Sequence, residues 1–224
     1  MEVSIRQWSN RAGQWLDGVQ NPTVPPLRDF KNLSSLSVSC SDNFPRAYSL
    51  RDEVAAAINA SPSLANLRIS TWSWDCGGGF TPLQAFLETS RPELVRLELG
   101  NVPLPGEGIR EILSDKLQHL SVSTPLGDHC VDFNWRKLWG ALQEAWIALS
   151  ILKVSGMENA MDEMSSYLLS YSGLERLEIT HLQLDGQEEE DRASLVFWHE
   201  IIPHHRDSLT APGILSILNI EQFT

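Results

Sequence analysis

The sequence predicts an α/β solenoid in which parallel strands line a concave face and helices cover a convex face. First, a short apolar pattern, L-x-x-L-x-(L/V/I), occurs seven times along the 224 residues, at spacings of 23 to 41 residues. Second, the apolar residues between these patterns have helical spacing. Third, turn signals separate the two kinds of segment. A strand–helix unit of this size cannot bury its own apolar face, so neighbouring units must stack.

Each apolar pattern predicts a short strand, because its last two apolar residues lie two apart and therefore point to the same side. The residues beside them point to the opposite side, toward solvent. The seven patterns are Leu33-Leu36-Val38, Leu64-Leu67-Ile69, Leu94-Leu97-Leu99, Leu117-Leu120-Val122, Leu149-Leu152-Val154, Leu174-Leu177-Ile179 and Leu215-Leu218-Ile220.

Helices are predicted between these strands, and the eight tryptophans are expected to lie mostly in the core at helical spacing. The apolar positions that indicate the helices are Leu50, Val54 and Ile58; Leu83, Phe86 and Leu87, after a Thr81-Pro82 start; Ile109, Ile112 and Leu113; Trp135, Leu138, Trp139, Leu142 and Trp146; Met161, Met164 and Leu168; and Leu195, Trp198 and Ile202, ended by Pro203.

Two regions are expected along the chain. Residues 1–29 form an N-terminal helix, indicated by the spacing Ile5-Trp8-Ala12-Trp15-Leu16, followed by a proline-rich lead-in. Residues 30–224 form about seven irregular repeats.

The repeating pattern resembles the leucine-rich-repeat superfamily over roughly residues 30 to 220, which implies a horseshoe-like solenoid. The usual repeat continues to an Asn or Cys whose side chain ties neighbouring turns together. In this chain that position holds Ser41, Trp72, Val102, Pro125, Met157, Leu182 and Phe223. The repeats are therefore irregular, and the hydrogen bonds between them are expected to come from backbone or water.

Four phrases resemble the irregular repeats that accompany F-box domains in fungal proteins. They are Arg6-Gln7-Trp8, Pro26-Leu27-Arg28, Tyr171 to Leu177 (YSGLERL), and Phe197-Trp198 with Pro203, His205 and Ser208-Leu209. The resemblance implies repeats that hold the substrate of a ubiquitin ligase. The chain shows no F-box, since residues 1–29 are too few and lack the Leu-Pro opening. The implied partners are another protein and, through a segment outside this chain, a ligase adaptor.

Composition and charge exclude several function classes. The net charge is −12 and no segment is strongly basic, which disfavours nucleic acid and anionic membranes as partners. No apolar run approaches the length of a membrane span, and the N-terminus resembles no signal peptide. The three cysteines, Cys40, Cys76 and Cys130, form no CxxC pair, which indicates a reducing compartment, the cytoplasm or nucleus.

No motif predicts an enzyme, a cofactor or a metal. The nearest approach is His199-Glu200 followed by His204, which differs from H-E-x-x-H because the second histidine lies at i+5 and Pro203 interrupts the helix. A helix C-terminus is the favoured interpretation, and a metal-dependent hydrolase using these three residues is the alternative. The glycines 77–79 lack the other residues of a phosphate-binding loop, and no G-x-S-x-G occurs.

The outward strand positions predict the binding surface as three columns. They are Ser35, Asn66, Arg96, His119, Ile151, Arg176 and Ile217; Ser37, Arg68, Glu98, Ser121, Lys153, Glu178 and Asn219; and Ser39, Ser70, Gly100, Ser123, Ser155, Thr180 and Glu221. The third column is small and hydroxylic. The residues predicted to contact a partner are Arg68, Arg96, Glu98, His119, Lys153, Arg176 and Glu178. The alternative is an ordinary hydrated sheet face, and Trp72 and Trp74 are further anchor candidates.

The predicted function is a non-enzymatic protein-interaction module, the substrate-recognition region of an F-box-like ubiquitin ligase component. The alternative within the same fold is a repeat scaffold with no ligase role.

Overall fold

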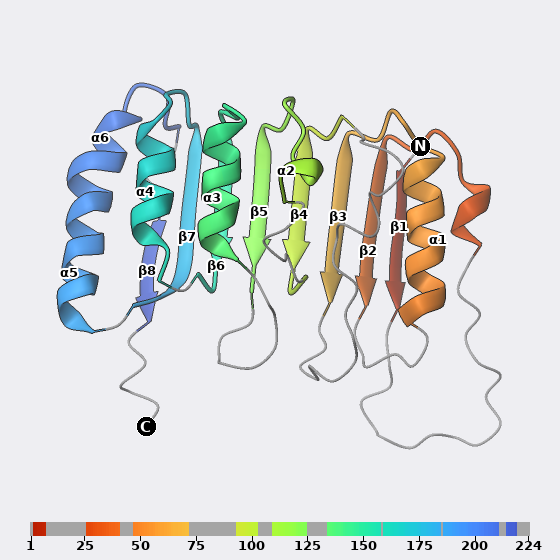
Figure 1. Ribbon diagram of the computed structural model, residues 1–224, viewed down its shortest axis with the longest axis horizontal. Coiled ribbons are helices and arrows are strands. Elements are labelled where there is room, and N and C mark those ends of the chain that lie inside the picture. The colour runs from red at the N-terminus through yellow and green to blue at the C-terminus, as the bar shows by residue number, and fades with distance from the viewer. Residues whose placement is uncertain are drawn as a thin grey trace, which may run out of the picture.

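The chain folds as an α/β protein, and its described residues form one sheet of eight parallel strands in sequence order (Figure 1). The computed structural model describes residues 2–7, 26–40, 47–71, 93–102, 109–124, 134–157, 159–184, 186–210 and 214–218. The strands are β1 (Glu2–Gln7), β2 (Ser35–Cys40), β3 (Asn66–Thr71), β4 (Arg96–Gly100), β5 (His119–Ser123), β6 (Ile151–Ser155), β7 (Arg176–Gln183) and β8 (Ile214–Leu218).

Helices connect most neighbouring strands. They are α1 (Ala47–Asn59), α2 (Ile109–Ile112), α3 (Trp135–Glu144), α4 (Met161–Leu169), α5 (Gln187–Val196) and α6 (Ile202–His204), with a 3-10 turn at Leu27–Asp29 and a π-helical turn at Phe197–Ile201. Across the described ranges, none of these helices has the length and apolar character that crossing a lipid bilayer requires.

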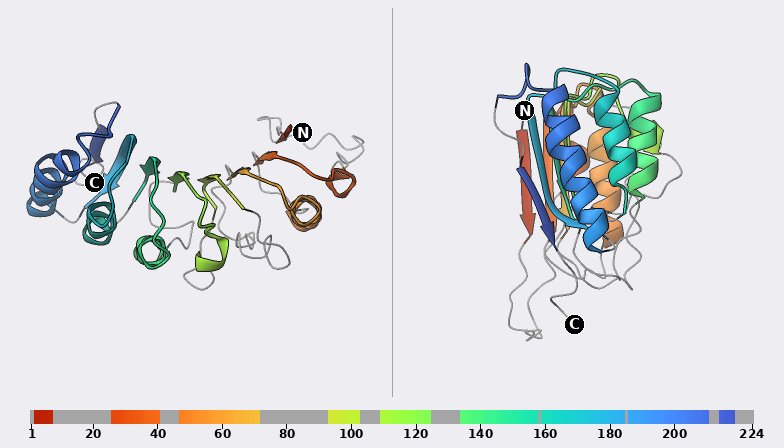
Figure 2. Two further views of the ribbon diagram at one scale, coloured as in Figure 1. Left: turned by 90° about the horizontal axis from the view of Figure 1, so that it is seen from above. Right: turned by 90° about the vertical axis from the view of Figure 1, so that its left-hand side faces the viewer.

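The helices all lie on one face of the sheet. Seen from above, the strands follow a shallow arc, and the helices stand on its outer side (Figure 2). No described helix covers the opposite, inner face. Parallel sheets normally have both faces covered, so the arrangement fits a solenoid-like α/β fold, in which each unit packs only on its neighbours.

The core fills the space between the sheet and the helices, as the apolar pattern predicts. Every member of the first six patterns is buried, with at most 4% of its surface exposed. The strands are also in the predicted register from β2 to β7; for example, Leu36 pairs with Leu67, and Leu67 with Leu97. The three predicted outward columns are therefore confirmed over these six strands.

The first strand was not predicted. Residues 2–7 form β1, which pairs with β2 in parallel, Ile5 opposite Val38. The expectation of a helix beginning at Ile5 is therefore wrong for these residues, because the open edge of β2 offers backbone partners that helical spacing does not reveal. Trp8, Ala12, Trp15 and Leu16 lie outside the described residues.

The last strand is paired in a different register from the predicted one. Leu215 lies opposite Ile179, and Ile217 lies opposite Leu182 instead of continuing the column of Arg176. A bulge in β7 between Ile179 and Leu182, where His181 has a φ of 56°, then shifts the pairing of Ile217 by one further residue. The predicted column members Asn219 and Glu221 lie outside the described residues.

The apolar stripe of the last helix also differs from the predicted one. Leu195 and Trp198 are exposed, and Ile202 is half-buried, whereas Ala193, Phe197 and Ile201 are buried. The buried residues keep a spacing of four from α5 into the π-helical turn, so the helix packs on a different face from the predicted stripe. The helix also continues past Pro203 to His204.

Backbone hydrogen bonds join neighbouring repeats, as expected for a chain without the usual Asn or Cys. The residues described at that position, Val102, Met157 and Leu182, are buried apolar side chains. One carbonyl before each of the strands β2 to β6 accepts two successive amides at the start of the next strand; these carbonyls belong to Ser34, Ala65, Val95, Gln118 and Ser150. Several other predictions concern residues outside the described ranges. They are those for the helix at Leu83–Leu87, for Trp72 and Trp74, and for Cys76, the glycines 77–79 and Cys130.

Candidate functional site on the open strand face

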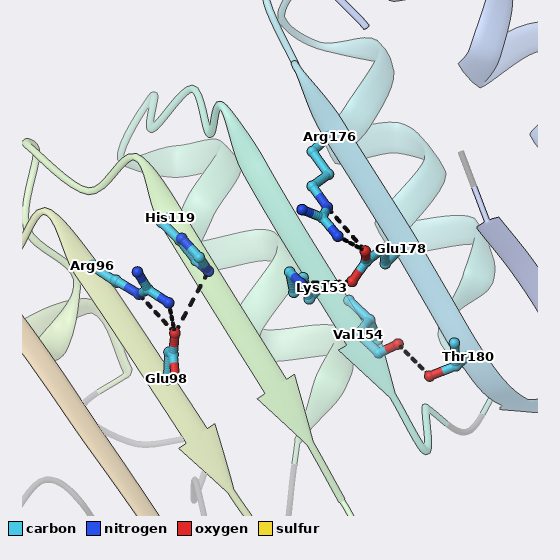
Figure 3. A network of polar contacts seen from close by, with 8 residues as sticks. All are labelled: Arg96, Glu98, His119, Lys153, Val154, Arg176, Glu178 and Thr180. Carbon is cyan, nitrogen blue, oxygen red and sulfur yellow. Dashed lines mark hydrogen bonds and ion pairs between the residues drawn. The ribbon is translucent and has the colours of Figure 1, made fainter. Parts of the chain in front are cut away.

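The open inner face of the sheet carries the residues predicted to contact a partner. We call the outward side chains of β2 to β7 the strand face. Its charged residues lie in two groups on neighbouring strands, and Figure 3 shows all of them except Arg68 from close by. The structure brings all seven predicted residues together on this face.

The first group, the Glu98 cluster, consists of Arg68, Arg96 and Glu98 on β3 and β4. Arg96 donates Nε–H to Glu98 Oε1 at 2.6 Å and makes a second bond to the same oxygen through Nη2 (Figure 3). Arg68 Nε lies 3.3 Å from Glu98 Oε2. The carboxylate is only 15% exposed, while the side chains of Arg68 and Arg96 are 62% and 50% exposed. Solvent therefore meets the guanidinium groups first.

The second group, the Glu178 cluster, consists of Lys153, Arg176 and Glu178 on β6 and β7. Lys153 donates from Nζ to Glu178 Oε2 at 2.8 Å, and Arg176 donates Nε–H to Oε1 at 2.9 Å. The hydrogen bond from Lys153, and then that from Arg176, lowers the pKa of Glu178. The carboxylate thus stays ionised at neutral pH and is paired with both cations.

His119 and Ile151 separate the two clusters. They pair across β5 and β6, and the His119 side chain is 13% exposed. Its Nε2 lies 3.9 Å from Glu98 Oε1, which is beyond hydrogen-bonding distance. Burial first, and then the charge of Arg96, lowers the pKa of His119. The imidazole is therefore neutral near pH 7, and an uncharged strip lies between the clusters.

The strand face has the opposite charge sign to the whole chain. Its outward positions on β2 to β7 hold four cations, Arg68, Arg96, Lys153 and Arg176, against two carboxylates, Glu98 and Glu178. The chain as a whole has a net charge of −12. A local positive excess on an acidic protein favours association with a negatively charged group.

The three residues of the alternative metal-dependent hydrolase site lie on the last helix, away from the strand face. His199 and Glu200 are exposed on the π-helical turn, and His204 ends α6 with its Nε2 hydrogen-bonded to the Tyr171 carbonyl at 2.7 Å. His204 and His205 thus lie at a helix end, as predicted. In the portion of the chain that the structure describes, no group of three or more His, Cys, Asp or Glu side chains could hold a metal ion.

A row of aromatic rings lies on the helix side, away from the strand face. Trp135, Trp139, Tyr167, Tyr171 and His205 follow one another with ring centroids 5.1 to 6.0 Å apart. Tyr167 donates its hydroxyl to the Ile147 carbonyl at 2.9 Å. These contacts hold α4 between α3 and the end of α6, on the face of the sheet opposite the strand face.

His205, at the end of this row, makes stability depend on pH. Its ring is buried; Nε2 donates to the Leu168 carbonyl at 2.9 Å, and Nδ1 has no partner. Burial, with a smaller effect of the neighbouring His204 charge, lowers the pKa of His205, although the bond to Leu168 opposes the shift. The unfolded chain therefore binds the proton first as the pH falls below about 6.5.

We expect the protein to have its full free energy of unfolding above about pH 6.5, where His205 is neutral in both states. The free energy of unfolding should fall as the solution is acidified toward pH 5. His205→Gln should flatten this dependence, and His119→Gln, which removes a second histidine of lowered pKa, should flatten it further. Urea unfolding at several pH values measures both slopes. If the free energy of unfolding of the His205→Gln protein depended on pH as steeply as that of the wild type, His205 would not be the source of the dependence.

One exposed residue was not found from the sequence. Trp146, predicted to continue the buried stripe of α3, is 88% exposed. The helix ends at Glu144, and Trp146 follows with a φ of 55°. Its amide bonds to the Gln143 carbonyl and that of Ile147 to Leu142, which is the Schellman arrangement that usually has glycine in this place. With no glycine or proline to mark the helix end, the sequence offered no signal.

The chain matches no protein family model, and no curated protein and no solved structure is detectably similar to it. The function must therefore be inferred from the geometry of the strand face.

Proposed function

We propose that this chain is a leucine-rich-repeat module that binds another protein on its strand face. The observation that carries the proposal is an open face of a parallel sheet, lined by cations held on neighbouring strands. Four exposed or half-exposed cations on an otherwise acidic chain supply charge complementarity, which governs specificity and association rate more than raw affinity. The fold alone implies no function.

A protein partner fits this face better than a nucleic acid. The positive excess is small, and each cluster contains a carboxylate, so a polyphosphate chain would meet local repulsion from Glu98 and Glu178 as well as the net charge of −12. A protein segment can place single carboxylates beside the guanidinium groups and leave the two glutamates undisturbed.

The resemblance to repeats of F-box proteins supports a finer proposal. In that form the strand face holds the substrate of a ubiquitin ligase, in the cytoplasm or nucleus, and a ligase adaptor is recruited by a separate segment. The repeat scaffold without a ligase role differs only in lacking the adaptor.

Affinity capture of the tagged natural gene product from its own cells, followed by mass spectrometry, tests the proposal. The strand-face variant Arg96→Glu/Arg176→Glu should lose the specific partner, because both clusters then become negative. Arg136→Glu/Arg192→Glu is the matched control, since it makes the same charge change at exposed positions of α3 and α5. The control should keep the partner, and both variants should unfold near the wild-type temperature because exposed ion pairs contribute little.

The outcomes separate the alternatives. Loss of the partner in both variants, or in the helix-side control alone, would contradict binding on the strand face. Capture of a ubiquitin ligase adaptor with the wild-type protein would support the ligase form. Capture of a strand-face-dependent partner without any adaptor would leave the repeat scaffold.

A further inference from the structure

The two cationic clusters are arranged across the strands at a fixed interval. The Glu98 cluster is centred on β4 and the Glu178 cluster on β7, so three strand-to-strand steps separate their carboxylates. Neighbouring strands lie about 4.8 Å apart, which gives a separation of roughly 14 Å. A partner that uses both clusters needs two anionic groups at about this distance.

An extended peptide that crosses the strands meets this interval after four residues. Each residue of an extended chain advances about 3.3 Å, so residues i and i+4 lie roughly 13 Å apart. An even number of steps also places the two side chains on the same side of the peptide. Both carboxylates can therefore point toward the sheet together.

The strip between the clusters favours uncharged residues. His119, Ile151 and Ser121 lie there, and Ile151 and the neutral His119 pair across β5 and β6. A charged side chain over Ile151 would lose solvation without gaining a partner. The middle residue of the peptide, which points toward the sheet like its two carboxylates, is therefore expected to be apolar.

The chain's own glutamates show how a carboxylate is held on each cluster. Arg96 and Arg176 each use two of their five N–H groups on an internal carboxylate, and among the described residues they make no further polar contact. The remaining N–H groups of these half-exposed side chains are available to a second carboxylate. Removal of an internal glutamate would free still more donors for the partner.

Resting on the proposed function, we infer that the strand face binds an extended acidic segment of the partner protein, with two carboxylates four residues apart and an apolar residue midway between them. One carboxylate contacts Arg68 and Arg96, and the other contacts Lys153 and Arg176. The uncharged middle of the segment lies over His119 and Ile151.

Fluorescence anisotropy with the full chain and three synthetic peptides tests the inference. The first peptide has two aspartates four residues apart around a central leucine, in a glycine–serine background. The second has the same residues with the aspartates two apart, and the third has asparagines in place of the aspartates. The first should bind at least about tenfold more tightly than either of the others, since one charge-assisted hydrogen bond fewer costs about that factor.

The variant Glu178→Gln tests whether the glutamate competes with the peptide for the cations or only positions them. This variant removes the internal competitor of the peptide, so the first peptide should bind several-fold more tightly than to the wild type. Glu144→Gln makes the same charge change at an exposed position of α3 and should leave the affinity unchanged. Weaker binding by Glu178→Gln at unchanged melting temperature would overturn the inference, because the glutamate would then orient the cations instead of competing for them.

Selection from a random-peptide library on the full chain, with counter-selection on Arg96→Gln/Arg176→Gln, separates the inference from the proposed function. Selected peptides with acidic residues four apart support both. Selected peptides that need the two arginines but carry no such acidic pair overturn the inference and leave the proposed function in place. If no peptide depends on the arginines, or a single-stranded oligothymidylate binds this face more tightly than the first peptide, the proposed function fails as well.

Discussion

Gly156→Ala is expected to lower the free energy of unfolding by about 3 kcal/mol. Gly156 follows β6 with a φ of +75°, where an L side chain is strained. A Cβ built on it would lie 2.3 Å from the Thr124 carbonyl oxygen. The same two residues are joined by the Thr124 hydroxyl bond to the Gly156 carbonyl, so neither backbone can move away freely.

Two other glycines separate the clash from the backbone strain. Gly173 has a φ of +103° with open space around its Cβ position, so Gly173→Ala should cost only about 1 kcal/mol. Gly140 lies inside α3 with nothing within 4 Å, so Gly140→Ala should stabilise the protein by about 1 kcal/mol. Urea unfolding measures all three. Equal losses at positions 156 and 173 would show that the close approach to Thr124 is not what matters.

Trp139→Ala is expected to lower the free energy of unfolding by about 4 kcal/mol. Trp139 is fully buried, with its ring stacked between those of Trp135 at 5.9 Å and Tyr167 at 6.0 Å. Truncation leaves a cavity between α3 and α4 that neither helix can fill. If the alanine variant does not fold, Trp139→Phe can be measured instead. Its loss of free energy of unfolding should be smaller, because the ring is partly retained and the indole Nε1–H has no hydrogen-bond partner to lose.

Trp146 is the matched control for Trp139, because it is the same residue type seven positions later. Its ring is 88% exposed and its φ of 55° is strained for a bulky residue. Trp146→Gly should raise the free energy of unfolding by about 1 kcal/mol, because glycine adopts this conformation without strain. A loss of several kcal/mol in this variant would show that the indole packs on the fold after all.

The repeating apolar pattern predicted most of the fold because it records burial directly. Leu36 and Val38 lie two positions apart and share one face of a strand, and this holds at the equivalent positions through Leu177 and Ile179. The outward columns follow from the same arithmetic, so the placement of Arg96 beside Glu98, and of Arg176 beside Glu178, could be anticipated without coordinates.

The remaining elements depend on backbone geometry that side-chain spacing does not record. The bulge in β7 shifts the pairing of Ile217 by one residue, and the last helix buries Phe197 in place of Trp198. The strand at Glu2–Gln7 is formed by pairing with a distant edge. The burial of Glu98 beneath two guanidinium groups likewise depends on side-chain conformations, which the sequence does not specify.

Photocrosslinking from two serines tests whether a partner lies on the strand face. A benzophenone amino acid would replace Ser123, on the strand face at β5, or Ser166, exposed on the helix side at α4. Both substitutions leave the charge unchanged. If the partner lies on the strand face, it crosslinks from position 123 and not from position 166. Crosslinking from position 166 alone would contradict this placement.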